Sequence, residues 1–303
     1  MYSEGFDDYA TARCRLADGA ATLKFATSEV GQGFVVIAGQ IARTVLGVDT
    51  VELEQIDTEI GSAGSTSASR QTWMSGGAVD SACREVRERL FEYVAAQHGL
   101  DPVQLGIDGT DVVDTVGTLR LPVAEVTRGQ VFEETVEFRH RPTEELDEDG
   151  QGNVHTAFAF AAHRAVVDVD VELGLVKVVE LACTQDVGKA INPEAVVGQI
   201  QGGSAQGLGL AIMEEIVVKD GIIKNPSFTD YLIPTIMDMP PMKIDVLEYA
   251  DPHAPYGLRG VGEAPTISSG PAVLAAIRDA TGLDLPRVPV RPEHITATLL
   301  DLG

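Results

Sequence analysis

One carboxylate in the C-terminal third of the chain follows a cluster of glycines. Gly257, Gly260 and Gly262 lead directly into Glu263. Glycine permits unusual backbone angles and close approach of the chain to another group, so this loop can present Glu263 to a bulky ligand with little obstruction. The alternative interpretation is a surface turn with a solvated glutamate.

A second glycine turn lies near the N-terminus. Gly31 and Gly33 flank Gln32 immediately before an apolar run that predicts a helix over residues 34–46. The first N–H groups of a helix have no partner within it, and its positive dipole end favours an anion such as phosphate. An ordinary turn ahead of a helix would have the same sequence.

The third candidate stretch, residues 61–75, combines small and hydroxyl-bearing residues. Its hydroxyl-bearing members include Ser62, Ser65, Thr66, Ser67 and Ser69. A flexible linker has a similar composition, but this stretch also carries Arg70, Gln71 and Trp73 and runs into a long amphipathic helix expected over residues 75–98. Its backbone N–H groups and hydroxyls suit a polar, oxygen-rich ligand, and an ordinary packed loop is the alternative.

A glycine-rich helix is expected over residues 193–218, with Asn192 as its N-cap and Pro193 in its first turn. Gln199, Gln201 and Gln206 supply amide groups along it. Each interior glycine costs about 0.5–1 kcal/mol relative to alanine, so the whole set needs a reason. One explanation for these glycines is very close packing of the helix against another backbone or a cofactor. The other explanation is crowding between helices alone. The glycines are Gly198, Gly202, Gly203, Gly207 and Gly209.

The remaining elements predict an α+β fold. Hairpins are expected over residues 9–28 and 157–186, a strand over 51–60, a strand pair within 112–120, a short helix from 121, an exposed loop at 143–153 and a helix opening at 270–271. Regular βαβ alternation is lacking, so we expect two subdomains, 1–128 and 129–303, with mixed or antiparallel sheets packed by long helices. His163, within the second hairpin, is interpreted as structural.

Charge and cysteine content restrict the function further. The chain has 22 Lys and Arg against 46 Asp and Glu, a formal charge of −24, which disfavours nucleic acid and anionic membranes as partners. Three widely spaced cysteines disfavour an iron–sulfur or zinc site within the chain. No apolar run approaches a membrane span, and we expect a cytoplasmic protein.

Taken together, these stretches resemble the molybdenum-cofactor-binding subunit of the xanthine dehydrogenase/aldehyde oxidase family. The similar segments are EVGQG (29–33), STSASRQT (65–72), DVGKAINPEAVVGQIQGG (186–203), NPSFTDYLIPT (225–235) and GLRGVGEAP (257–265). They occur in fixed order and span nearly the whole chain. The bacterial xanthine dehydrogenases are the most similar members.

The resemblance implies roles for individual residues. Gln32, between Gly31 and Gly33, would bond the pterin or an oxo ligand of the metal, and Gln199 would contact the pterin. Glu263 matches the general base of the family. No side chain of this chain would ligate the metal directly. The residues that would line the cofactor are Thr66, Ser67, Ala68, Ser69 and Gln71.

The resemblance also implies a hetero-oligomer. The cofactor would be molybdenum-molybdopterin, with FAD and iron–sulfur clusters on other chains, and the reaction would be the hydroxylation of a purine such as hypoxanthine or xanthine. The chain resembles only the C-terminal half of the cofactor-binding unit, so activity would need the N-terminal half. There are two alternatives to a purine hydroxylase. The chain would be a non-catalytic scaffolding half, or it would belong to a hydroxylase for aldehydes or other N-heterocycles.

Overall fold

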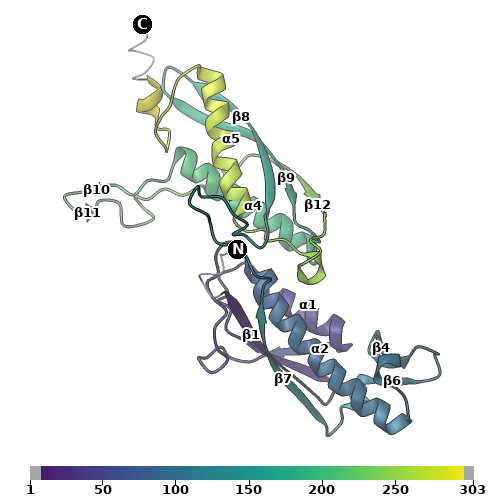
Figure 1. Ribbon diagram of the computed structural model, residues 1–303. Helices are drawn as coiled ribbons and strands as arrows, with labels where there is room; N and C mark the ends of the chain where they lie inside the picture. Colours follow the sequence, from purple (N-terminus) through teal and green to yellow (C-terminus); the bar gives the residue numbers. More distant parts are fainter. Residues whose placement is uncertain (1–7, 297–303) are drawn as a thin grey trace. The chain divides into compact units, whose positions relative to one another are not determined.

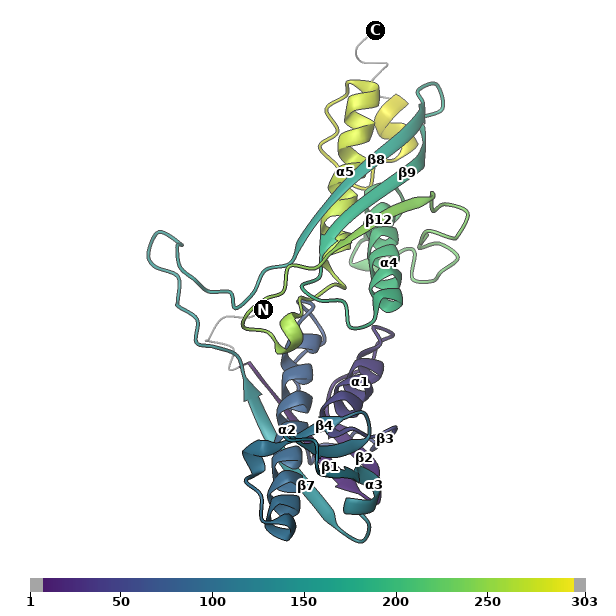
Figure 2. The same cartoon turned by 90° about the vertical axis from the view of Figure 1, so that its right-hand side faces the viewer.

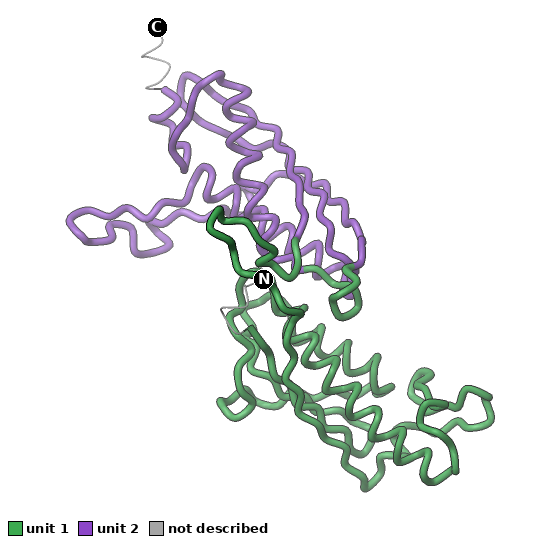
Figure 3. Tube along the Cα trace, in the orientation of Figure 1, with its two compact units in different colours: residues 1–158, 251–259 green, residues 159–250, 260–303 purple. Residues whose placement is uncertain are grey.

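The computed structural model describes residues 8–296. The chain forms two compact units (Figure 3), and each combines a β-sheet with long helices (Figure 1). Unit 1 runs to Phe158 and takes in Asp251–Arg259, and unit 2 comprises Ala159–Ala250 and the chain from Gly260 onward. The expected α+β class is therefore confirmed.

The division between the units differs from the predicted boundary at 128/129. Strand β7 (Val131–Arg139) pairs antiparallel with β1 (Tyr9–Ala17) along its whole length. This pairing keeps the chain beyond residue 128 within unit 1. Because the two strands are more than 100 residues apart, local sequence patterns did not reveal it.

The main sheet of unit 1 has the strand order β3-β2-β1-β7. A two-residue turn, Asp18-Gly19, joins β1 to β2 (Ala20–Phe25), and both turn residues have positive φ, as a tight hairpin turn requires. Alternate β1 residues are buried in the core. Edge strand β3 (Thr50–Leu53) is shorter than the strand predicted over 51–60.

Two helices pack with this sheet (Figure 2). Helix α1 (Phe34–Leu46) ends at Gly47, as expected, and α2 (Gln71–His98) lies against β1, β7 and α1. The inward face of α2 includes Met74, Val79 and Leu90, all fully buried. A smaller sheet of unit 1 contains β4 (Leu105–Asp108), β5 (Asp111–Asp114) and β6 (Arg120–Pro122), and the short helix α3 (Val123–Val126) follows it.

Unit 2 contains the predicted long hairpin. Strands β8 (Phe160–Asp170) and β9 (Leu175–Asp186) are antiparallel, and β12 (Met242–Leu247) joins β9 in parallel. Helices α4 (Pro193–Ile212) and α5 (Ala264–Thr281) pack against each other and, with the sheet, enclose an apolar core around Leu181, Leu208 and Ile277. The short hairpin of β10 (Val218–Lys219) and β11 (Ile222–Ile223) extends from the end of α4 (Figure 1).

Two helix boundaries in unit 2 differ from the predictions. Helix α4 ends at Ile212 and not at 218, because the side chain of Asn225 bonds the backbone of Glu215 and Val217 and holds that segment in an extended hairpin. Helix α5 begins at Ala264, six residues before the predicted start at Gly270. Pro271 lies inside α5, where it leaves the carbonyl of residue 267 without its helical N–H partner.

None of the helices between residues 8 and 296 has the length and apolar character needed to span a bilayer.

Candidate active site

The predicted site residues fall into two groups, one in each unit. In unit 1, Glu29 occupies the start of α1. One carboxylate oxygen of Glu29 accepts from the N–H groups of Gly31 and Gly33 at 3.0 and 2.9 Å, and the other accepts from Val35 at 3.2 Å. The expectation that these N–H groups are available to an external anion is therefore wrong. The negative charge at this helix end belongs to the chain itself.

The side chain of Gln32 folds back onto its own loop. Its Oε1 accepts from the N–H of Val30 at 2.7 Å, and its Nε2 donates to the carbonyl of Ser28 at 3.1 Å. Thr66 also donates to the Ser28 carbonyl, at 3.0 Å, although it lies 38 residues further along the chain. The carbonyl of Ser28 thus brings two predicted cofactor loops together.

The hydroxyl-rich loop before α2 has unusual backbone angles. Ala68 and Ser69 have φ values of 54° and 49°, in the left-handed region. This conformation costs a non-glycine residue about 1–2 kcal/mol, and strain of this kind clusters at ligand-binding positions. The Oγ atoms of Ser65 and Ser67 are 2.7 Å apart. This strained and polar segment carries four of the residues predicted to line the cofactor.

Arg70 holds this loop in place, a role that the sequence analysis did not assign. Its guanidinium is fully buried and bonds both carboxylate oxygens of Asp8. Its Nη1 also donates to the carbonyls of Ala63 and Ser65 at 2.5 and 3.1 Å. The sequence signal was an arginine in an otherwise uncharged serine-rich stretch.

Gln71 is buried beneath the same loop. Its Nε2 donates to the carbonyl of Ser65 at 2.9 Å, and its Oε1 accepts from the hydroxyl of Ser75. Thr27 donates to that hydroxyl at 2.7 Å. In this structure the side chain of Gln71 therefore supports the loop from within the chain.

The helix starts differ in how they are capped. Glu29 bonds the start of α1, and Asn192 accepts from the N–H of Ala195 at 3.1 Å at the start of α4. Within the described residues, α2 and α5 have no capping side chain and no acidic residue in the first turn. These two helices follow the loops predicted to face the cofactor. Backbone N–H groups, hydroxyls and amides form a donor set that fits the oxygen-rich groups of a molybdopterin.

In unit 2, Glu263 is the N-cap residue of α5 and its side chain is exposed to solvent. The loop before it is held from two sides. The Nε2 of Gln185 donates to the carbonyl of Val261 at 3.1 Å. On α4, the position that a Cβ on Gly203 would take lies 3.0 Å from the carbonyl oxygen of Gly262. The structure therefore places Glu263 at the end of a supported loop.

The glycines of α4 serve different purposes. A Cβ at Gly207 would lie 2.0 Å from the Oγ of Ser269 and 2.7 Å from the carbonyl oxygen of Thr266, both on α5. Gly203 and Gly207 thus allow two helices to cross with their backbones in close contact. Added Cβ atoms at Gly198 and Gly202 would meet nothing within 4 Å, so helix crowding does not explain these two.

Gln199 lies one turn before Gly203 on α4 and is half-buried. Residues separated by four positions share a helix face, so Gln199 lies on the face that meets the Glu263 loop. The structure therefore brings these two predicted site residues to the same part of unit 2.

His163 joins β8 to both helices of unit 2. Its Nδ1 lies 2.8 Å from the Oγ of Ser268 on α5, and its Nε2 lies 2.9 Å from the Oγ of Ser204 on α4. Burial lowers the pKa of His163 below its ordinary value. Hydrogen bonds at both ring nitrogens are consistent with the structural role expected for this residue.

The segment that precedes the glutamate loop packs in unit 1. Tyr256 has a left-handed φ of 55°, and its hydroxyl donates to Asp80 on α2 at 3.0 Å. Burial raises the pKa of Tyr256 above its ordinary value. Arg259 donates to the carbonyl of Phe158 at 2.9 Å. The chain passes from unit 1 to unit 2 between Arg259 and Gly260, shortly before Glu263.

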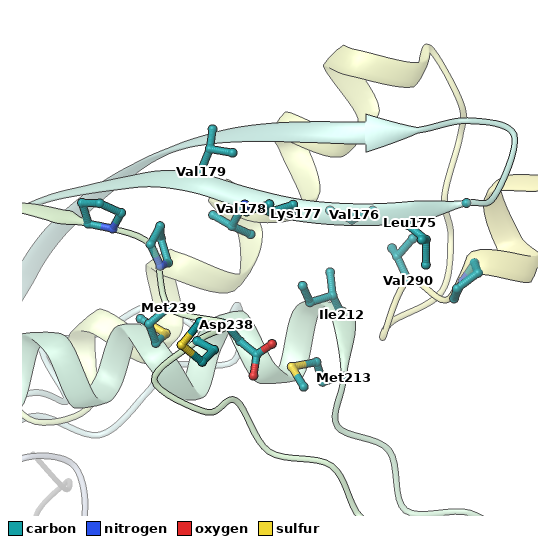
Figure 4. A pocket seen from close by; sticks show the side chains of 15 residues that line it. Leu175, Val176, Lys177, Val178, Val179, Ile212, Met213, Asp238, Met239 and Val290 are labelled. Carbon is teal, nitrogen blue, oxygen red and sulfur yellow. The ribbon is translucent and has the colours of Figure 1, made fainter.

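A pocket of about 630 Å³ in unit 2 contains none of the predicted site residues (Figure 4). Its lining includes Val176, Ile212 and Met239, together with the charged residues Lys177 and Asp238. The carboxylate of Asp238 accepts two bonds from Thr235, which lower its pKa. We assign no chemistry to this pocket.

Residues 1–240 match the family model described as "Molybdopterin cofactor-binding domain". The chain therefore belongs to this family, and the resemblance to molybdenum hydroxylases inferred from the sequence is confirmed.

Relatives of known description extend the comparison. The chain is 31% identical to a probable xanthine dehydrogenase polypeptide of Bacillus subtilis, over 95% of its own length and 39% of the relative. It is 29% identical to the nicotine 6-hydroxylase large subunit of Paenarthrobacter nicotinovorans, over 98% of this chain and 38% of the relative.

A solved structure agrees with these sequence relatives. Quinoline 2-oxidoreductase from Pseudomonas putida 86 superposes with a TM-score of 0.85 at 27% identity, covering 97% of this chain and 38% of that one. The chain thus spans about two-fifths of the length of the proteins it matches. The names of these relatives also indicate that related chains act on chemically different substrates.

Proposed function

We propose that this chain is the part of a molybdenum hydroxylase that binds the molybdopterin cofactor and supplies its general base, in an enzyme that hydroxylates a purine. The observation that carries the proposal is the position of Glu263. It is an exposed carboxylate at the start of α5, and the glycine loop before it is held by the hydrogen bond from Gln185 to Val261 and by the close approach of Gly203 to Gly262. The similarity to a probable xanthine dehydrogenase polypeptide supports a purine as substrate.

Residues of both units contribute to this function. The bound molybdenum cofactor supplies the oxidation chemistry. Glu263 takes up the proton of the oxygen nucleophile, and Gln199 binds the pterin from α4. In unit 1, Gln32 exchanges its internal bonds to Val30 and Ser28 for bonds to the cofactor.

The strained loop of unit 1 provides further cofactor contacts. Ser67, Ala68 and Ser69 precede the uncapped start of α2, where peptide N–H groups and the helix dipole favour electron-rich oxygen atoms. Thr66 exchanges its bond to the Ser28 carbonyl for a bond to the cofactor, while Gln71 keeps the loop in place from below. No cationic side chain is needed for this interaction.

The enzyme would be a cytoplasmic hetero-oligomer. Iron–sulfur and FAD subunits would carry electrons away from the cofactor, and a further polypeptide region would complete the cofactor-binding unit. The shares of 39% and 38% of the first two relatives support the need for such a region.

The test is to co-express the chain with the missing region and the iron–sulfur and flavin subunits, and to measure molybdenum content and dye reduction with hypoxanthine. We expect bound molybdenum and hypoxanthine-dependent turnover. Gln32→Ala should lower molybdenum content before it lowers turnover per molybdenum. A complex that binds no molybdenum would contradict the proposed cofactor role.

A second candidate is the hydroxylation of a different N-heterocycle. The observation that favours it is the similarity to nicotine and quinoline enzymes at nearly the same identity. Dye reduction with quinoline or nicotine, and none with hypoxanthine, would select this candidate. A complex that binds molybdenum but oxidises none of these compounds or a test aldehyde would favour a scaffolding role.

A further inference from the structure

Gln185 is a buried polar residue at the end of the central strand of unit 2. It is the penultimate residue of β9 and is 0% exposed. Its side chain lies on the same inward face of the strand as Leu181 and Cys183, which precede it at alternate positions. Its Nε2 donates to the carbonyl of Val261 at 3.1 Å. Val261 lies two residues before Glu263, so a rigid strand is joined directly to the loop of the proposed base.

The orientation of this amide is determined by its partner. A carbonyl oxygen accepts hydrogen bonds only, so the nitrogen of Gln185 must face Val261. The reversed amide would set two oxygen atoms against each other. The Oε1 of Gln185 is then directed elsewhere, and it is buried with no hydrogen-bond partner among the described residues.

An unpaired buried oxygen is unfavourable for folding. An apolar side chain of similar size at position 185 would avoid this cost and would still fill the space. The contact with Val261 is what such a side chain would lose. The Oε1 of Gln185 is thus unfavourable for stability, whereas its Nε2 fixes the carbonyl of Val261.

The loop needs an anchor of this kind. Gly260 and Gly262 flank Val261, and glycine gives the backbone more conformational freedom than any other residue. On the α4 side, Gly203 approaches Gly262, and Thr266 donates to the carbonyl of Gly203 at 3.0 Å. Gln185 completes the support from the sheet side.

We propose that Gln185 is a positioning residue for the base, holding the carbonyl of Val261 so that the Glu263 carboxylate keeps its reactive orientation. This inference rests on the proposed role of Glu263 as general base. Misplacement of a catalytic group by about 1 Å can cost about 100-fold in rate. We therefore expect a loss of about 10- to 100-fold when the contact is removed.

The test variant is Gln185→Met, which keeps the length of the side chain and removes the amide. Gln201→Met, at an exposed glutamine on α4, is the matched control. In the molybdenum-loaded complex, Gln185→Met should lower kcat per molybdenum by about 10- to 100-fold with little change in KM or molybdenum content. Its thermal midpoint should stay near that of the wild type, because the unpaired oxygen is removed while the hydrogen bond to Val261 is lost.

Two further readouts separate positioning from a merely structural role. Amide hydrogen exchange of residues 260–264 should be faster in Gln185→Met than in Gln201→Met, also without cofactor. In a Glu263→Gln background, Gln185→Met should cause no further loss of turnover, because it acts through Glu263.

Different failures are distinguishable. If Glu263→Gln alone retains normal turnover per molybdenum, the proposed function fails. If Glu263→Gln loses turnover while Gln185→Met leaves turnover and loop exchange unchanged, the inference about Gln185 is overturned. The inference is also overturned if Gln185→Met loses molybdenum in step with activity. The same holds if, in the Glu263→Gln background, Gln185→Met lowers the residual turnover by the same factor as in the wild-type background.

Discussion

Two of the loops proposed to serve the cofactor are held by opposite kinds of interaction. In unit 1 the loop over residues 61–69 is fixed by a buried charge pair, Arg70 with Asp8, and contains left-handed residues. In unit 2 the loop before Glu263 is fixed by a neutral amide from Gln185 and by backbone packing against Gly203.

This difference agrees with the role proposed for each loop. Charged hydrogen bonds are stronger than neutral ones, and a strained serine-rich loop needs strong bonds to keep its shape. A buried cation beside the proposed base would instead stabilise the charged carboxylate and weaken it as a proton acceptor. The hydrogen bond from the neutral amide of Gln185 adds no such charge to this loop.

The largest effect on stability is expected from breaking the charged support. Arg70→Met leaves the buried carboxylate of Asp8 unpaired, which typically costs about 3–5 kcal/mol. Denaturant unfolding followed by the fluorescence of Trp73 reports on unit 1, because Trp73 is the only tryptophan of the chain and lies buried in α2.

Two controls sharpen this prediction. Arg89→Met removes exposed ion pairs with Glu134 and Glu92, which should cost about 0–1 kcal/mol. Adding Asp8→Asn to Arg70→Met should recover part of the loss. If Arg70→Met and Arg89→Met cost equally little, the buried ion pair would stabilise unit 1 no more than the exposed ones do.

A smaller loss is expected from disturbing the packing in unit 2. Gly207→Ala would put a Cβ atom 2.7 Å from the carbonyl oxygen of Thr266 and 2.9 Å from the nitrogen of Gly270. Overpacking of this kind costs about 1–3 kcal/mol. Gly202→Ala, in the same helix with open space around it, should instead stabilise by up to about 1 kcal/mol.

Unfolding of both variants by circular dichroism compares them directly. The helix crossing would not depend on backbone proximity if Gly207→Ala proved as stable as Gly202→Ala.

The smallest effect concerns pH. Burial lowers the folded-state pKa of His163 below 6.5, so the folded state disfavours its charged form. The stability that the neutral imidazole gives is fully present above pH 6.5 and is lost as the pH falls below that value. Thermal unfolding of unit 2 between pH 7.5 and 5 should show this decrease, and His163→Gln should make the curve flatter. An unchanged slope in His163→Gln would assign the pH dependence to other groups.

Much of the fold could be predicted because local patterns determine it. The Asp18-Gly19 turn, the end of α1 at Gly47 and the Asn192 cap of α4 all follow from short-range preferences. The pairing of β7 with β1 and the start of α5 could not be predicted. The first depends on contacts distant in sequence, and the second on a helix that accommodates Pro271.

The site could be predicted only in outline. Position, residue type and the family resemblance single out Glu263 as a candidate, whereas the bonds of Glu29 to the helix start and of Arg70 to Asp8 depend on the folded chain. Gln185 had a readable signal, because it is a polar residue at an inward position of an alternating strand. Its partner, Val261, lies 76 residues away and could not be inferred.

The measurement that tests the central claim most directly is turnover per bound molybdenum in a Glu263→Gln complex. Glutamine keeps the size and hydrogen bonding of the side chain but cannot accept the proton. We expect turnover to fall by about 10⁴-fold, at the upper end for loss of a general base, while molybdenum content and thermal stability stay near wild type. Normal turnover per molybdenum would contradict the account, and loss of molybdenum in step with activity would make Glu263 a structural residue.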